Sequence, residues 1–271
     1  MLSAGQVSCI IPVRDRARMV TRAVASVLAQ RTARKLEIIV VDDGSGDDSG
    51  QVVAERFPGV SVIRTPHRGP GPARNLGVAA ASSELIMFLD SDDQWLPDHV
   101  EALLAPMEQG MEMAYGVTCT VNELDGGTFL IPDQGRGPRG RCLAALVRWC
   151  FLVPSSVAVT RRAFEEAGGF EPLPLGEDWH FFVKVARNHP LGFIPRVVTR
   201  RRLHPGSLSA AACRPRAVLG LLRSLRQCLT GDDHGDLIAH LDRAMELAAK
   251  EGHQWKTVQD WYNSMRHAGL A

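Results

Sequence analysis

The sequence predicts an α/β protein with a mixed, mostly parallel sheet that is flanked by helices and followed by a C-terminal helical extension. Over the first hundred residues, short continuous apolar runs alternate with segments of helical periodicity. This alternation is typical of a parallel sheet covered on both faces. From about 112 to 205 the strand and helix patterns are mixed, and after 209 the strand patterns stop. We therefore expect a main domain at 1–209 and a helical extension at 210–271.

The first half of the chain supplies four strands, and polar residues follow most of them. The strands are predicted at VSCIIPV (7–13), LEIIVVDD (36–43), VSVIRT (60–65) and ELIMFLD (84–90). Four helices are predicted at Val20/Val24/Val27/Leu28, after SGDDS, at PARNLGVAAA (72–81) and at Val100/Leu103/Leu104/Met107. The spacing of their apolar residues is that of one helix face. Parallel sheets bind ligands beyond the carboxyl ends of their strands, so the polar residues there are the site candidates.

The second half mixes both patterns before it becomes helical. Strands are predicted at 111–121, 155–160 and 195–201, and helices at 139–150 and 177–188. The Gly/Pro-rich stretch 125–140 is predicted to be a loop that borders the cleft. Three helical stripes finish the chain, at Val218/Leu222/Leu225/Leu229, Leu237/Leu241/Met245 and Trp255/Val258/Tyr262/Met265. They could pack on the main domain or on a second chain as a homodimer.

Composition indicates a globular protein with no strong overall charge. The chain has 271 residues, 45% of them hydrophobic and 23% charged, and its formal net charge is +1. Such a chain is globular rather than disordered, and any electrostatic argument must be local. No apolar run reaches the roughly 18 residues of a membrane span, and the N-terminus lacks signal-peptide features. The six cysteines form no CxxC pair. We therefore expect a cytoplasmic protein with reduced thiols.

Acidic residues gather at two of the predicted strand ends. Asp42 and Asp43 end the second strand, and Asp90, Asp92 and Asp93 follow the fourth. Clustered carboxylates at a sheet edge suit a hard divalent cation with oxygen ligands, Mg²⁺ or Mn²⁺. The alternative is that the last three acids only begin a helix at Leu96-Pro97, where the helix dipole favours negative charge. Neither GxGxxG nor GxxxxGK[ST] follows the first strand, which disfavours NAD and P-loop sites.

Four segments resemble, in order and spacing, the family 2 glycosyltransferases. They are VSCIIPVRDRA, EIIVVDDGSGDDS, GPARNLGVAAASSELIMFLDSDDQWLPD and GGFEPLPLGEDWHFFVKVAR. The resemblance covers about 7–209 and implies a catalytic domain with a GT-A-type, Rossmann-like fold. It implies an inverting enzyme that moves a sugar from a nucleoside diphosphate donor, a UDP-sugar in the first place, to an acceptor hydroxyl. The acceptor would be a glycan, a glycolipid or another hydroxyl compound in cell-surface polysaccharide biosynthesis.

The resemblance also implies which residues bind the donor. Those matching the first nucleotide-contacting turn are Pro12, Val13, Arg14 and Asp15. The family more often has an aromatic-Asn pair at 14–15. Those matching the base-binding, cleft-lining and ribose positions are Asp43, Arg74, Asn75, Asp90, Ser91 and Glu177.

Metal and base roles fall on three further residues. Asp92, the second acid of the DxD motif, matches the metal ligand. His204 matches a histidine that joins the metal in several related enzymes, although a lone histidine is more often structural. Asp178 of GEDW matches the general base, and inverting transfer needs one carboxylate to take the acceptor proton and a Lewis acid for the leaving diphosphate. Capping of the helix that starts at Glu177 is the alternative and is compatible with that role.

Positive charge gathers between Asp178 and Asp232, where ten Lys or Arg and no Asp or Glu occur. Arg200–Arg202 could meet a diphosphate or an anionic acceptor. Arg214–Arg226 accompany the next helical stripe, which is compatible with peripheral contact with an anionic membrane at its inner face, or with a solvated helix face. No nucleic-acid motif accompanies the charge. Two other functions stay open: a sugar nucleotidyltransferase, which normally has a Gly-rich loop after the first strand, and a non-catalytic nucleotide-sugar-binding module.

Overall fold

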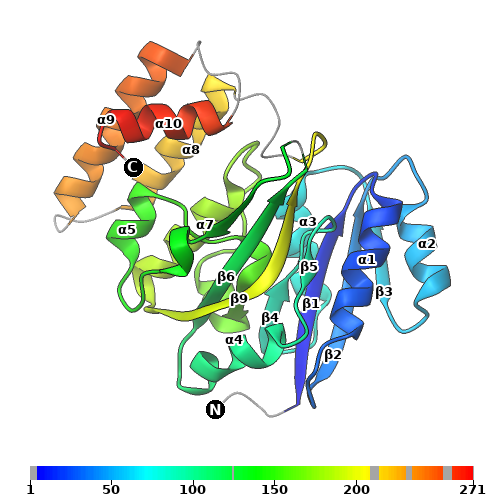
Figure 1. The fold of residues 1–271 in the computed structure, drawn as a ribbon. Coiled ribbons are helices and arrows are strands. Elements are labelled where there is room, and N and C mark those ends of the chain that lie inside the picture. The colour runs from blue at the N-terminus through cyan, green and yellow to red at the C-terminus, as the bar shows by residue number, and fades with distance from the viewer. Residues whose placement is uncertain (1–4, 124, 208–213, 230–233, 253–257, 271) are drawn as a thin grey trace.

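A computed structural model describes residues 5–123, 125–207, 214–229, 234–252 and 258–270. Its first four strands are those that the apolar runs predict: β1 (Gln6–Val13), β2 (Lys35–Asp43), β3 (Ser61–Thr65) and β4 (Leu85–Phe88). They are parallel neighbours in the order β3-β2-β1-β4. The carboxyl ends of these strands therefore lie along one edge of the sheet (Figure 1), which is where the sequence places the cleft.

Helices cover this half of the sheet on both faces. They are α1 (Ala17–Leu28), α2 (Ser49–Arg56), α3 (Pro70–Ala80) and α4 (His99–Glu108). Because strand side chains alternate between faces, Ile10 packs in the cluster that contains α3, whereas Cys9 and Ile11 pack with α1 and α4. One prediction is wrong in detail, because α4 begins at His99 instead of Leu96-Pro97. Leu28 is the last residue of α1, as its helical spacing predicts, but it is exposed.

The second half of the chain completes the sheet with strands of mixed direction. They are β5 (Gln94–Trp95), β6 (Met113–Asn122), β7 (Thr128–Ile131), β8 (Val157–Thr160) and β9 (Leu191–Leu203). β8 lies antiparallel between β4 and β6, β9 runs parallel to β6, and β5 pairs antiparallel with β9. The predicted loop 125–140 is partly wrong, because it contains β7, which pairs with β6, and the short helix η1 (Asp133–Gly135). The predicted class, a mixed and mostly parallel sheet flanked by helices, is confirmed.

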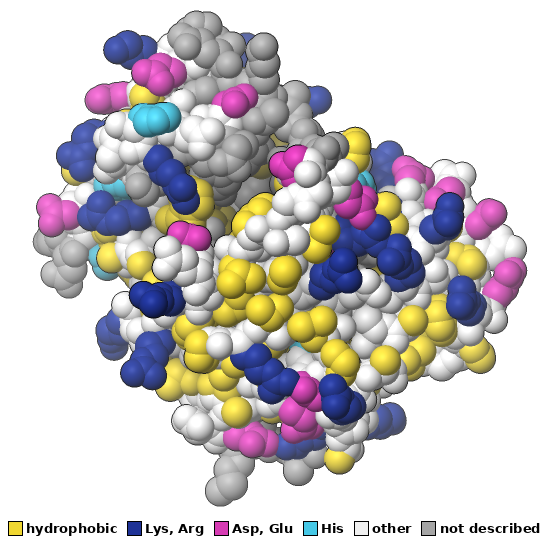
Figure 2. All heavy atoms as spheres, in the orientation of Figure 1, with side chains coloured by type: hydrophobic (Ala, Val, Ile, Leu, Met, Phe, Trp, Pro, Cys, Tyr) yellow, Lys and Arg dark blue, Asp and Glu magenta, His cyan; other side chains and the backbone are white. Residues whose placement is uncertain are grey.

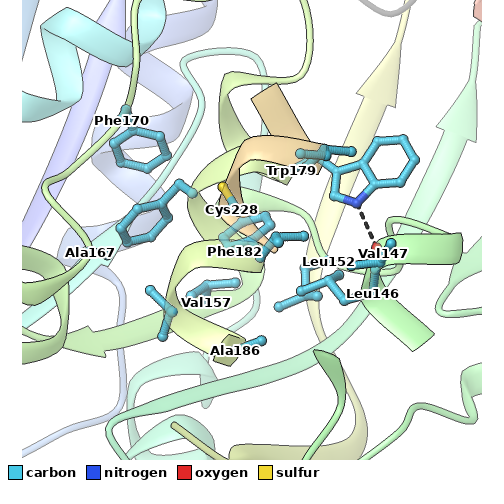
Figure 3. Close-up of a cluster of buried hydrophobic side chains, with 14 of the residues drawn as sticks. Leu146, Val147, Leu152, Val157, Ala167, Phe170, Trp179, Phe182, Ala186 and Cys228 are labelled. Carbon is cyan, nitrogen blue, oxygen red and sulfur yellow. Dashed lines mark hydrogen bonds between the residues drawn. The ribbon is translucent and has the colours of Figure 1, made fainter. Parts of the chain in front are cut away.

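One helix of this half, α7 (Glu177–Asn188), has the bounds that the sequence predicts. The helices that precede it in this half are α5 (Leu143–Arg148), η2 (Pro154–Ser156) and α6 (Arg161–Glu166). α5 is shorter than the predicted helix 139–150. The apolar stripe of α7 is buried, and the indole N–H of Trp179 donates to the Leu146 carbonyl of α5 over 2.6 Å (Figure 3). This packing fixes α7 and therefore the direction of its first turn.

The C-terminal extension consists of α8 (Pro215–Cys228), α9 (Gly235–Glu251) and α10 (Val258–His267). Val218, Leu222 and Leu225 of α8 are buried in the same apolar cluster as α7, so the extension packs on the main domain (Figure 1). The apolar stripe of α8 is thus not free to enter a membrane. In the described ranges, no helix combines the length and apolarity needed to span a bilayer. The predicted boundary at 209–210 and Trp255 of the last stripe lie outside the described residues.

The cysteines within the described ranges, Cys9, Cys119, Cys142, Cys150 and Cys228, are free thiols, as predicted. Cys213 lies outside those ranges.

Candidate active site

Asp92, in the acidic turn after β4, lies between the end of β9 and the start of α1. Its Oδ2 is 3.1 Å from Nε2 of His204 and 2.9 Å from Nη1 of Arg16. His204 follows β9 directly and is buried, and Arg16 immediately precedes α1. The structure therefore brings together the two predicted metal ligands and adds Arg16, which lies in the segment VSCIIPVRDRA but has no role assigned from the sequence.

Asp92 and His204 suit a divalent cation by ligand type and by spacing. Adjacent ligands of an octahedral ion with bonds of about 2.1 Å lie about 3 Å apart. The separation between Oδ2 and Nε2 is 3.1 Å. The described residues contain no group of three or more His, Cys, Asp or Glu side chains that could hold a metal ion. Mg²⁺ commonly takes only one or two carboxylates and completes its shell with substrate phosphates and water. The pair thus fits an ion that arrives with a phosphate-bearing substrate.

Two donors already point at the Asp92 carboxylate. The backbone N–H of Gly206 donates to Nδ1 of His204 over 3.2 Å, so in the neutral ring the hydrogen is on Nε2, which faces Asp92. Arg16 donates to the same carboxylate oxygen and, through Nη2, to the Gly206 carbonyl over 2.8 Å. A cation bound at this oxygen would lie next to both donors and compete with them.

Arg74 of α3 joins the acidic turn to the first turn of α7. Its Nη2 donates to Oδ1 of Asp90 over 2.5 Å and its Nη1 to Oε1 of Glu177 over 3.0 Å. The guanidinium also lies over the ring of Phe170, 5.2 Å from the centroid, and the side chain is only 4% exposed. Burial lowers the pKa of Arg74, but Asp90 and Glu177 outweigh burial and the net pKa is raised. A charged arginine therefore holds two predicted site residues together.

Glu177 and Asp178 form the first turn of α7, beside Arg74. Oδ1 of Asp178 accepts a hydrogen bond from the N–H of Trp179 over 2.7 Å. Burial raises the pKa of Asp178, against the lowering effect of Arg74, and the Asp90 carboxylate adds to the increase. Burial and the adjacent Asp178 carboxylate raise the pKa of Glu177 to about 7, again against Arg74. A carboxylate of raised basicity is what a general base requires.

Ser155, in η2, forms hydrogen bonds with two residues of the acidic turn. Its hydroxyl donates to Oδ2 of Asp93 over 2.6 Å and accepts from the N–H of Asp90 over 3.0 Å. Its carbonyl accepts from the indole N–H of Trp95 over 2.9 Å, and Oδ1 of Asp93 accepts from the N–H of Arg202 over 3.1 Å. Asp93 therefore links the turn to β9 and does not start a helix. The sequence shows Ser155 only as part of a strand pattern.

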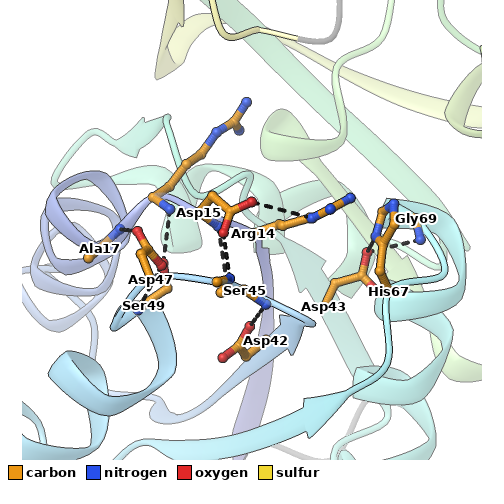
Figure 4. Close-up of polar contacts among 12 residues, drawn as sticks. Arg14, Asp15, Ala17, Asp42, Asp43, Ser45, Asp47, Ser49, His67 and Gly69 are labelled. Atoms are coloured by element: carbon orange, nitrogen blue, oxygen red, sulfur yellow. Dashed lines mark hydrogen bonds and ion pairs between the residues drawn. The ribbon is translucent and has the colours of Figure 1, made fainter.

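Asp43, at the end of β2, fixes the turn that leads into α3. Its carboxylate accepts from Nδ1 of His67 over 2.8 Å and from the N–H groups of Arg68 and Gly69 over 2.8 and 2.9 Å (Figure 4). Gly69 has a φ of 97°, in the region that favours glycine. A carboxylate has about four acceptor positions, so one remains for a nucleotide base. That contact stays a prediction.

The turn after β1 is tied to the turn after β2 by Asp15. Its Oδ1 accepts from the N–H of Gly46 over 2.7 Å, and its own N–H donates to the hydroxyl of Ser45 over 3.1 Å (Figure 4). Arg14 lies beside Asp15, with 3.4 Å between Nε and Oδ2, and is exposed. Of this predicted nucleotide-contacting pair, Asp15 therefore holds the turn, while the side chains of both residues are exposed.

Four other predicted nucleotide-contacting residues are embedded in the fold. Both amide atoms of Asn75 bond to the backbone of Phe170, with Nδ2 donating over 2.8 Å and Oδ1 accepting over 2.9 Å. Pro12, Val13 and Ser91 are buried. Pro12 and Val13 could reach a ligand only through their backbone, and the nucleotide contacts of all four stay predictions.

Of the basic run at the end of β9, Arg201 lowers the pKa of Asp178 against the effect of burial, and the backbone N–H of Arg202 donates to Asp93. Arg202 forms an ion pair with Glu123, and Arg200 is exposed. On the face shown in Figure 2, basic side chains gather over the region where β1, β5 and α1 lie in Figure 1. The edge of the sheet that carries the acidic residues is therefore bordered by positive charge.

The curled mixed sheet, with the site at the carboxyl ends of its parallel strands, defines a GT-A-type glycosyltransferase domain. The chain belongs to glycosyl transferase family 2, whose model matches residues 8–167. Structures of residues 1–349 of TarS from S. aureus share the fold. The complex with UDP-GlcNAc has a TM-score of 0.70 at 18% identity and covers 90% of this chain and 72% of that one.

Several curated proteins are similar in sequence to this chain. The succinoglycan biosynthesis protein ExoW of Rhizobium meliloti is 31% identical over 182 residues, which cover 59% of this chain and 57% of the relative. Chondroitin synthase of Escherichia coli is 30% identical over 205 residues, covering 73% of this chain and 29% of that protein. An uncharacterized glycosyltransferase of Rickettsia felis is covered over 34% of its length. The chain thus spans about a third to just over half of the curated relatives it matches.

Proposed function

We propose that this chain transfers a sugar from a nucleoside diphosphate donor, in the first place a UDP-sugar, to an acceptor hydroxyl with inversion. The observation that carries the proposal is the position of Arg74. One buried guanidinium bonds both to Asp90, in the turn that would receive the donor, and to Glu177, next to the predicted base. Donor site and base are thereby held in a fixed relation, as an in-line displacement requires.

Asp178 is the general base of this proposal. It would take the proton of the acceptor hydroxyl as that oxygen forms its bond to the anomeric carbon and the bond to the diphosphate breaks. The Trp179 N–H orients its carboxylate, and burial raises its pKa, which strengthens it as a base. An α-linked donor would then give a β-linked product.

Mn²⁺ or Mg²⁺ would be held by Asp92 and His204, and when bound it would supply Lewis-acid stabilisation of the leaving diphosphate. The charge balance of the site supports this role. Burial raises the pKa of Asp93, and the Asp90 and Asp92 carboxylates raise it further. Glu177 and Asp178 also have raised pKa values. Burial is the largest cause of each increase, so a bound cation would favour the ionised carboxylates.

The donor nucleotide would lie along the edge formed by β1, β2 and β4. Asp43 and its turn would meet the base, Asp90 the ribose, and Arg14 and Arg201 the phosphates. Arginine suits phosphate because its planar donors match two oxygens at once. The UDP-GlcNAc complex of TarS supports a UDP-sugar as the first donor to test.

The acceptor is proposed to be a glycan or glycolipid hydroxyl in polysaccharide biosynthesis. This assignment is supported by relatives named for succinoglycan biosynthesis and chondroitin synthesis. Since the apolar face of α8 is buried, any contact with an anionic membrane would depend on charge alone. Arg214, Arg216 and Arg223 are exposed along α8 and its start. We propose action at the cytoplasmic face of the membrane without insertion.

The test is a panel of nucleotide-sugars incubated with Mn²⁺, with released nucleoside diphosphate as the readout. One or more UDP-sugars should turn over, and Asp178→Asn should lose transfer while it still binds UDP. Full transfer by Asp178→Asn would contradict the base assignment alone. If neither UDP nor GDP with Mn²⁺ shifts the melting temperature, the nucleotide-sugar site itself is wrong. Binding without turnover of any donor would indicate a binding module.

A further inference from the structure

The structure gives Arg16 a position that the chemistry of the site does not require. Its side chain reaches across from the start of α1 to Asp92 and to the Gly206 carbonyl, with distances of 2.9 and 2.8 Å. Both partners lie far from Arg16 in the sequence. Gly206 also donates to His204, the other predicted metal ligand. Arg16 therefore contacts Asp92 directly and is linked to His204 through Gly206.

We propose that Arg16 occupies the cation position beside Asp92 in the nucleotide-free protein and leaves it for the diphosphate of the donor. The inference rests on the proposed function. It makes binding of a divalent cation depend on the nucleotide, because the protein carries its own counter-ion until a diphosphate is present.

The competition follows from the geometry. A metal ion bound at Asp92 Oδ2 would lie next to the guanidinium that now donates to this same oxygen. Two positive charges in contact with one carboxylate oxygen repel each other, so Arg16 opposes binding of the ion for as long as it stays at Asp92. The side chains of Arg16 and Asp92 are only 21% and 10% exposed, so water screens their attraction weakly. The ion pair is therefore a substantial barrier to binding of the metal alone.

A diphosphate removes this barrier in two ways. It adds negative charge and metal-binding oxygens at the site, and it offers the guanidinium planar oxygen pairs in place of the Asp92 carboxylate. Release of Arg16 also frees the Gly206 carbonyl.

The experiment measures binding of Mn²⁺ to the full chain by the loss of its free EPR signal, first without nucleotide and then with saturating UDP. Wild type should bind Mn²⁺ weakly alone and much more tightly with UDP. Arg16→Met keeps the side-chain length without the charge and should bind Mn²⁺ alone about ten- to a hundredfold more tightly than wild type, which corresponds to loss of one hydrogen bond between charged groups. Arg18→Met is the matched control, because Arg18 is exposed on the same helix start. It should bind as wild type does.

Equal Mn²⁺ affinity of Arg16→Met and wild type without nucleotide would overturn the inference. If wild type fails to bind Mn²⁺ even with UDP, the proposed function fails as well, so the two failures are distinguishable. Arg16→Lys gives a second test that does not depend on a neutral variant folding. It keeps one positive charge, and its Mn²⁺ affinity without nucleotide should stay closer to wild type than to Arg16→Met. Melting curves of all variants report whether each is folded.

Discussion

Replacing Arg74 by methionine should destabilise the protein by about 3–5 kcal/mol at pH 7.5, which is the typical effect of removing one partner of a buried ion pair. The substitution leaves Asp90 and Glu177 without the donors that now lie 2.5 and 3.0 Å away. Glu177 is only 12% exposed and contributes most of this loss, whereas Asp90 is 27% exposed and is partly rescued by water. Loss of the cation–π contact with Phe170 adds about 0.5–2 kcal/mol within that range.

The assay is equilibrium unfolding in urea followed by tryptophan fluorescence, at pH 7.5 and at pH 5. Without Arg74, the folded-state pKa of Glu177 rises further above its unfolded value. The folded state then binds more protons than the unfolded state, so the destabilisation is largest above that pKa and shrinks as the pH falls below it. Arg162→Met is the control, since the pair of Arg162 with Glu112 is exposed on the arginine side and should be worth less than about 1 kcal/mol. A loss below about 1 kcal/mol for Arg74→Met at pH 7.5 would refute this account of the site.

Two further predictions concern activity. Ser155→Ala should raise the KM for the donor about tenfold and leave the fold intact, because the turn that carries Asp90 loses its hydroxyl partner. Ser156→Ala should leave the KM unchanged, because the Ser156 hydroxyl donates to the Val153 carbonyl. An equal KM in both variants would contradict the role given to Ser155. The acidic limb of kcat/KM should lie above the usual aspartate range, since Asp178 must be ionised and burial raises its pKa. Asp90→Asn removes a negative charge that raises the pKa of Asp178 and should move that limb to lower pH; a limb that stays in place or moves upward would argue against Asp178 as the base.

Most of the sheet could be predicted because its strands are continuous apolar runs. β1 and β2 match their predicted ranges to within one residue, and α7 matches its range fully. β7 was missed because Thr128–Ile131 is short and lies in a stretch rich in glycine and proline, where turn signals dominate. Leu28 fits the helical spacing of α1 but is exposed at the last position of the helix.

The predicted site residues are those that a local motif reveals, whereas other site residues are brought together only by the fold. The motifs identify Asp92, Asp178 and Arg74 because each belongs to a short pattern with its own chemistry. Arg16 lies in the first of the family-like segments but has no role assigned there, and Ser155 belongs to no such pattern. The hydrogen bond from Asp90 to Ser155 joins residues 65 positions apart, and only the fold brings them together. A contact of that kind cannot be found from spacing along one sequence.

We propose above all that the edge of the sheet near Asp92 and Asp178 binds a nucleoside diphosphate with a metal ion and that Asp178 acts only in the chemical step. Calorimetric titration of UDP with Mn²⁺ into wild type, Asp92→Ala and Asp178→Asn tests it most directly. Wild type and Asp178→Asn should bind with equal affinity within about threefold, and Asp92→Ala should bind at least about tenfold more weakly, since it loses a charge-assisted metal ligand. Wild-type affinity in Asp92→Ala would contradict the claim.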